Sequence, residues 1–155
     1  MTLSVVSCKN NGIDTPITPL TAGETNASVT PFGSFHATDS QVTDGLTTFT
    51  VRASIPTADA VKDSVVITII ATKQGLTPYT IDFSSDASSL VDYCIVTASG
   101  TCTNYRLQKG KGNGTLRISN ITVNSNVQGT FSGTLQALNG TGTITISGGE
   151  FYASF

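Results

Sequence analysis

The sequence predicts an all-β domain, an antiparallel β-sandwich or partly closed barrel of about eight to ten strands. Residues 127–137 alternate between apolar side chains and hydroxyl or amide side chains, and a period of two is typical of a half-buried antiparallel strand. Charged residues make up only 12% of the chain, about half the usual share. Thr, Ser, Asn and Gly take their place, which favours strands and turns over helices. A chain of 155 residues is long enough for one domain with a hydrophobic core and too short for two comfortable ones.

The same composition argues against several classes of function. The net charge is −2, so we expect no nucleic-acid partner, because binders of polyanions need clustered Lys and Arg. No run of residues approaches the ~20 apolar positions that a membrane-spanning helix needs. The chain has one histidine, His36, so we expect no catalytic triad and no metal cluster built on imidazoles. We therefore expect no metal, no cofactor and a non-enzymatic role in binding or structure.

The first eight residues predict a lipid anchor. Residues 5–8 read VVSC and resemble a bacterial lipobox, in which a signal peptidase cuts before a cysteine that then carries lipid. On this interpretation residues 1–8 are the remnant of a lipoprotein signal peptide, and Cys8 is the lipidated residue that attaches the chain to a membrane. The alternative is a chance apolar tetrapeptide in front of a free thiol.

Residues 9–31 predict a flexible tether. They are rich in Thr, Asn, Pro and Gly and show no periodicity, so they bury too little apolar surface to order themselves. We then expect a single β-domain over residues 32–155. A lipid, a spacer and a folded domain together predict a protein of the bacterial cell envelope, anchored in the outer membrane on either its periplasmic or its surface side.

Within that domain the strand signals follow one another closely. One segment, residues 64–72, is apolar on both faces and β-branched throughout, which predicts a central strand covered on both sides. The other segments expected as strands in this half of the chain are residues 32–38, 46–54, 79–83, 90–98 and 101–108.

The last two of these segments predict a hairpin that carries a disulfide. If Cys94 faces Cys102 directly across the two strands, the two Cα atoms lie within disulfide range. A disulfide indicates an oxidising compartment, and it leaves Cys8 as the lipid acceptor. In this register Asp92 and Arg106 lie diagonally across the strands on the same face as the two cysteines, and that face is exposed to solvent.

Two tyrosines on the other face of this hairpin are the candidate ligand-binding residues. Tyr93 and Tyr105 lie on neighbouring strands of one face, where they could stack against a sugar ring. The favoured alternative is that both side chains fill the core of the domain.

The C-terminal block predicts one irregular strand and one tight turn. Four apolar residues of this block change from even to odd positions between 118 and 121. If all four face the core, the chain must slip by one residue, which predicts a bulge near residues 119–120. Gly148 and Gly149 are expected as a two-residue hairpin turn that sets Ile146 opposite Phe151. The four apolar residues that define the change of face are Leu116, Ile118, Ile121 and Val123.

Residues 112–155 also carry a resemblance to a known family. The segments GTLRI (114–118), VQGTFSG (127–133) and ITISGGEF (144–151) are similar to those of small lipoproteins from Bacteroidetes-type bacteria, classed as a domain of unknown function. The resemblance implies a bacterial envelope lipoprotein and brings no catalytic residues. A carbohydrate-binding or adhesive module is one alternative, and a hydrolase whose carboxylates meet only in the folded domain is another.

Overall fold

The computed structural model describes residues 19–57, 62–75 and 77–155. Over this part the chain is all-β, as predicted, with eleven strands in a single sheet, one more than the upper end of the expected range. The strands are β1 (Glu24–Thr30), β2 (Gly33–Ala37), β3 (Ser40–Asp44), β4 (Thr48–Pro56), β5 (Lys62–Thr72), β6 (Tyr79–Asp82), β7 (Leu90–Thr97), β8 (Cys102–Leu107), β9 (Asn113–Thr122), β10 (Asn126–Ala137) and β11 (Thr143–Ser154).

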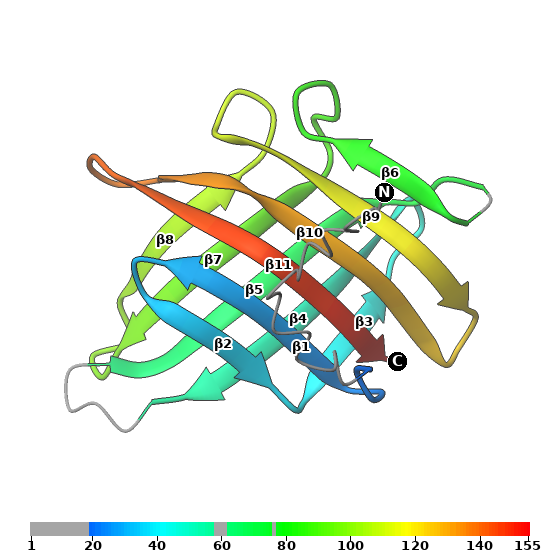
Figure 1. Cartoon of the computed structure of the whole chain (residues 1–155), viewed down its shortest axis with the longest axis horizontal. Coiled ribbons are helices and arrows are strands. Elements are labelled where there is room, and N and C mark those ends of the chain that lie inside the picture. The colour runs from blue at the N-terminus through cyan, green and yellow to red at the C-terminus, as the bar shows by residue number, and fades with distance from the viewer. Residues whose placement is uncertain (1–18, 58–61, 76) are drawn as a thin grey trace, which may run out of the picture.

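The sheet folds back on itself to form two layers. Its strand order is β2-β1-β11-β3-β4-β5-β7-β8-β10-β9-β6, and β10 also pairs with β11. Figure 1 shows β1, β2, β9, β10 and β11 in front, and β3, β4, β5, β7 and β8 crossing behind them. The two layers are joined at short junctions, through two residue pairs between β8 and β10 and one parallel pair between β11 and β3. The result is one large mixed sheet and not a regular barrel.

The hydrophobic core lies between the two layers. Alternate side chains point inward from strands β4, β5, β7, β10 and β11. Burial of one large aliphatic or aromatic side chain contributes about 1.5–3 kcal/mol to the stability of the fold. The largest fully buried side chains are Phe49, Phe83, Phe151, Ile67, Ile69, Ile81, Leu107, Leu116, Ile118, Leu135, Ile144 and Ile146.

The expected start of the domain is corrected by strand β1. Residues 24–30, predicted as part of the flexible tether 9–31, pair with β2 on one side and β11 on the other. Thr25, Ala27 and Val29 are buried, and the residues between them face outward. The strand was missed because its inward side chains are small or polar. Residues 9–18 of the expected tether and the expected signal-peptide remnant at 1–8 lie outside the described residues.

Strand β5 departs from the expectation of cover on both sides. Its inward face packs into the core, where Ile67 and Ile69 are 1% and 0% exposed. On the outer face Val66 is also buried, whereas Ile70 is only partly buried. The described residues include no second layer over that outer face, so neighbouring strands of the same sheet provide its partial cover.

The bulge predicted in the C-terminal block is confirmed. Asn120 pairs with Gln128 while Ile118 pairs with Gly129, so Ser119 is the extra residue on β9. The bulge returns Ile118 to the core face, where it is fully buried.

The turn predicted at Gly148 and Gly149 is wrong. Strand β11 continues through both glycines, and its register against β10 shifts between Ile146 and Gly149. Gly148 has a φ of 58°, so the strand changes face at a bulge and does not reverse direction. A pair of glycines suits either geometry, since both need a residue that accepts positive φ.

Two phenylalanine rings lie over glycine backbone where β10 and β11 pair. Gly129 is the partner of Phe151, and Phe131 is the partner of Gly149. A Cβ atom added to Gly129 would lie 2.5 Å from Cζ of Phe151, and one added to Gly149 would lie 2.8 Å from the ring of Phe131. Both glycines therefore lie where backbone and a ring approach too closely for a Cβ atom.

Candidate functional site

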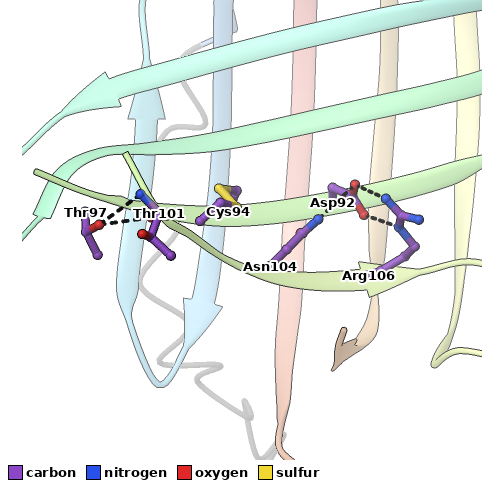
Figure 2. Close-up of a disulfide and its surroundings, with 7 residues drawn as sticks. Asp92, Cys94, Thr97, Thr101, Asn104 and Arg106 are labelled. Atoms are coloured by element: carbon purple, nitrogen blue, oxygen red, sulfur yellow. Dashed lines mark hydrogen bonds and ion pairs between the residues drawn. A yellow bond between two sulfur atoms is a disulfide. The ribbon is translucent and has the colours of Figure 1, made fainter. Parts of the chain in front are cut away.

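The β7–β8 hairpin carries the predicted disulfide. The structure joins Cys94 to Cys102, with their Cα atoms 5.8 Å apart (Figure 2). The predicted register was wrong by two residues, because Cys94 pairs with Asn104 and Cys102 pairs with Val96. The cysteines are therefore diagonal neighbours and not direct partners.

The loop at the end of the hairpin explains this register. Thr97 N donates to Thr101 O at 2.8 Å, and Thr97 Oγ1 accepts from Thr101 N at 3.1 Å. These bonds leave residues 98–100 as a three-residue loop, and Gly100 takes a φ of 81° within it. The direct register of the two cysteines would centre the loop on Ala98 and place Gly100 in a strand, whereas the observed loop has Gly100 at its left-handed last position, as three-residue hairpin loops favour.

The same face of the hairpin carries a paired acid and base. Asp92 and Arg106 are direct partners across the strands, where a diagonal placement was expected. Arg106 Nε donates to Asp92 Oδ1 at 2.7 Å and Nη2 donates to Oδ2 at 2.6 Å, as Figure 2 shows. Hydrogen bonding to Asp92 raises the pKa of the Arg106 guanidinium. The two charges satisfy each other, so this face stabilises the hairpin and offers no open charge to a ligand.

The candidate tyrosines lie on the inward face of the hairpin, as predicted. Tyr93 and Tyr105 are direct partners, and Tyr93 is only 4% exposed. The ring of Phe32 stacks on Tyr93 with centroids 5.8 Å apart and an interplanar angle of 10°, and it also contacts Tyr105 at 5.9 Å. Burial raises the pKa of the Tyr93 hydroxyl. Phe32 occupies the place where a sugar ring would stack on Tyr93, and this arrangement agrees with the alternative that the tyrosines fill the core.

A cavity of about 490 Å³ opens at the end of the domain that lies to the right in Figure 1. We call it the end cavity. It is surrounded by the β3–β4 turn, by residues 73–75 and 77 between β5 and β6, by the β9–β10 turn and by Phe155. Its lining residues are Asp44, Phe49, Lys73, Gln74, Gly75, Thr77, Ile121, Val123, Asn124, Val127 and Phe155.

Apolar side chains line one part of the end cavity, from buried residues to exposed ones. Phe49 and Val127 are buried core residues that form the floor, and Ile121 is half-buried beside them. Val123 is 77% exposed and Phe155 is 43% exposed. Val123 had been expected in the core, but it follows the bulge of β9 into the turn, where it lines the cavity instead.

The charged side chains of the end cavity are paired. Lys73 forms an ion pair with Asp44, and its Nζ also donates to Gly45 O at 2.6 Å. Gln74, Thr77 and Asn124 provide the remaining polar groups. An apolar chamber with a few polar groups at its rim is typical of a small-molecule site.

Sequence reasoning missed the end cavity because its residues come from four separate segments. The one local signal is the apolar Val123 within the polar run TVNSN at 122–126. The bulge prediction assigned that residue to the core.

Two further cavities lie elsewhere on the domain. One of about 470 Å³ includes Asn26, His36 and Gly148 in its lining, and His36 Nδ1 is hydrogen bonded to Asn26 Oδ1. The other, of about 370 Å³, includes Glu150. Among the described residues no group of three His, Cys, Asp or Glu side chains is placed to hold a metal ion.

The described part of the chain contains no helix that is long and apolar enough to span a membrane. No family model, no curated protein and no solved structure matches the chain. The resemblance to small lipoproteins of Bacteroidetes-type bacteria therefore stays a prediction.

Proposed function

We propose that this chain is a lipid-anchored protein of the bacterial cell envelope whose β-domain binds a ligand without catalysing a reaction. The observation that carries the binding role is the end cavity. Its volume of about 490 Å³ falls within the range of about 300–1,000 Å³ that small-molecule sites occupy. Its charged groups are one ion pair, Asp44 with Lys73, and not a nucleophile beside a base.

The disulfide supports the cellular location. Structural disulfides form and persist in oxidising compartments such as the bacterial periplasm, and Cys94 and Cys102 are joined. The sequence contains three cysteines, so Cys8 is the one left to accept lipid. The outer membrane is then the direct partner of the chain through this anchor.

The alternatives have less support from the described residues. A carbohydrate-binding role for Tyr93 and Tyr105 would require Phe32 to leave its stacked position on Tyr93. A hydrolase with assembled carboxylates needs two acids facing one cleft. Each of the three cavities described above includes at most one carboxylate, Asp44 in the first and Glu150 in the third.

The anchor is tested by expressing the gene from its complete signal peptide in a bacterial host. We expect the wild-type protein to partition into the detergent phase, and Cys8→Ser to move it to the aqueous phase. The double variant Cys94→Ser, Cys102→Ser is the matched control, because it replaces the two disulfide-bonded cysteines and should stay in the detergent phase. A wild-type protein found only in the aqueous phase would refute the anchor.

A further inference from the structure

We propose that the end cavity binds an uncharged small molecule with an apolar body and one polar end. This inference rests on the binding function proposed above and adds the chemical class of the ligand. It is argued from the lining of the cavity, from the pairing of its charges and from the hydrogen bonds that hold its walls.

The apolar lining sets the body of the ligand. Phe49 and Val127 close the floor, and Val123 and Phe155 stand exposed at the mouth. Exposed apolar side chains around an apolar cavity are unusual on a monomer surface and mark binding sites. A ligand that reaches from the floor to the mouth would remove both exposed side chains from water, which favours binding in proportion to the apolar area covered.

The charges at the rim set the polar end of the ligand. Lys73 is engaged twice, with the Asp44 carboxylate and with Gly45 O. An anionic ligand would have to draw Lys73 away from Asp44, and a cationic ligand would have to draw Asp44 away from Lys73. Either exchange leaves one charge without its partner, which has a modest cost because the side chains of Lys73 and Asp44 are 34% and 52% exposed. Hydroxyl and amide groups at the rim, from Thr77, Gln74 and Asn124, instead suit an uncharged hydrogen-bonding group.

Backbone hydrogen bonds hold the walls of the cavity in place without a ligand. Lys73 N donates to Thr47 O at 2.8 Å and joins the end of β5 to the β3–β4 turn. Phe155 N donates to Ser125 O at 3.1 Å and joins the last residue to the β9–β10 turn. A preformed site loses little conformational entropy on binding, so affinity for small apolar compounds is expected even where they make few polar contacts.

The probe for this site is N-phenyl-1-naphthylamine, an uncharged amphiphile that fluoresces in apolar surroundings. Its anionic relative 1-anilinonaphthalene-8-sulfonate tests the assignment of charge. We expect the wild-type protein to bind the uncharged probe saturably with one site per chain, and to bind the anionic probe at least about tenfold more weakly.

Gly75 offers a variant that changes the cavity lining. It lines the cavity and a Cβ atom added there meets nothing within 4 Å, so Gly75→Phe adds a ring to a lining residue without a backbone clash. We expect the affinity for the uncharged probe to fall by about tenfold or more. Thr141→Phe is the matched control, since it adds the same ring to an exposed residue of the β10–β11 turn, outside the cavity, and should leave the affinity unchanged. Phe155→Ala removes one wall at the mouth and should weaken binding by roughly threefold.

Far-UV circular dichroism and thermal unfolding establish that each variant is folded. Three results would overturn the inference: no saturable binding by wild type, equal loss of affinity in Gly75→Phe and Thr141→Phe, or tighter binding of the anionic probe. An affinity that weakens as protein concentration rises would also overturn it, because a second copy of the chain would then cover the mouth. The detergent partition of Cys8→Ser reports separately on the envelope anchor, so the two proposals fail independently.

Discussion

The ring of Phe151 occupies the space that a side chain on Gly129 would need. The two residues are direct partners across β10 and β11, and a Cβ atom on Gly129 would lie 2.5 Å from Phe151 Cζ and 2.4 Å from Arg117 O. Because one of these contacts is backbone, the clash cannot be relieved by rotating the phenylalanine alone.

We therefore expect Gly129→Ala to lower the free energy of unfolding by roughly 1–3 kcal/mol, the usual result of overpacking a core. Urea denaturation followed by circular dichroism measures this change. Gly75→Ala is the matched control, since its added Cβ atom meets nothing within 4 Å, and it should be neutral or slightly stabilising. Equal stability of Gly129→Ala and wild type would show that β9 and Phe151 can move apart at this point.

The Asp92–Arg106 pair predicts that lysine cannot replace Arg106 without loss. The guanidinium donates through two nitrogens to the two carboxylate oxygens, whereas an ammonium group cannot reproduce that planar fork. We expect Arg106→Lys to lower the free energy of unfolding by about 1 kcal/mol, measured by chemical denaturation at low salt. Arg117→Lys, at an exposed position of β9, is the control and should have no effect. An equal loss of stability in both variants would contradict a specific role for the paired guanidinium of Arg106.

The disulfide predicts a stability difference between oxidised and reduced protein. Closing the short loop between Cys94 and Cys102 should contribute roughly 2–3 kcal/mol, chiefly by restricting the unfolded chain. We expect reduction to lower the denaturation midpoint while the β-sheet spectrum is retained. The double variant Cys94→Ala, Cys102→Ala should show no response to reductant. Mass spectrometry of non-reduced peptides checks the bond itself, and two free thiols in protein purified from the periplasm would contradict it.

The carboxylate of Asp86 predicts a loss of stability in acid. Burial alone would raise its pKa, but hydrogen bonds from Ser88 N at 2.7 Å, Ser89 N at 3.0 Å and Ser89 Oγ at 3.0 Å outweigh burial and lower the pKa. Ser89 Oγ in turn accepts from Thr72 N at 3.0 Å, which joins this loop to the end of β5.

A pKa that is lower in the folded state stabilises the fold above the unfolded value of about 4, and this contribution is lost as pH falls through the folded value. Asp86→Asn should therefore be less stable than wild type at pH 7, by at most about 1 kcal/mol because the group is partly exposed to solvent. The difference should shrink on acidification to about pH 3 or below. Denaturation at both pH values measures it, and a difference that grows in acid would contradict the assignment.

Local alternation predicted which side chains face the core. Val127, Phe131 and Leu135 are buried as expected, because a strand fixes its two faces over neighbouring residues. The inward position of Tyr93 and Tyr105 and the shared face of the two cysteines also follow from this period of two.

The register and the site could not be predicted in this way. The hairpin register depends on loop length, and moving it by two residues leaves every side chain on the same face. Strand β1 was missed because Thr25 and Ala27 give almost no hydrophobic signal, although both are buried. The end cavity depends on which turns meet in space, and strand order cannot be obtained from alternation.

The position of β11 has a consequence for when the domain can form. It lies between β1 and β10 and also touches β3, so in the described part of the chain the hairpin of β1 and β2 is paired with the rest of the sheet through residues 143–154. A ribosome delivers these residues after all the other strands. Contacts between such distant parts of a chain form slowly, and until they form the hairpin of β1 and β2 lacks the strand that pairs it with the rest of the sheet. During synthesis the antiparallel pairs among β3, β4, β5, β7 and β8 can form first, and the edge of β1 stays unpaired until this last strand is made.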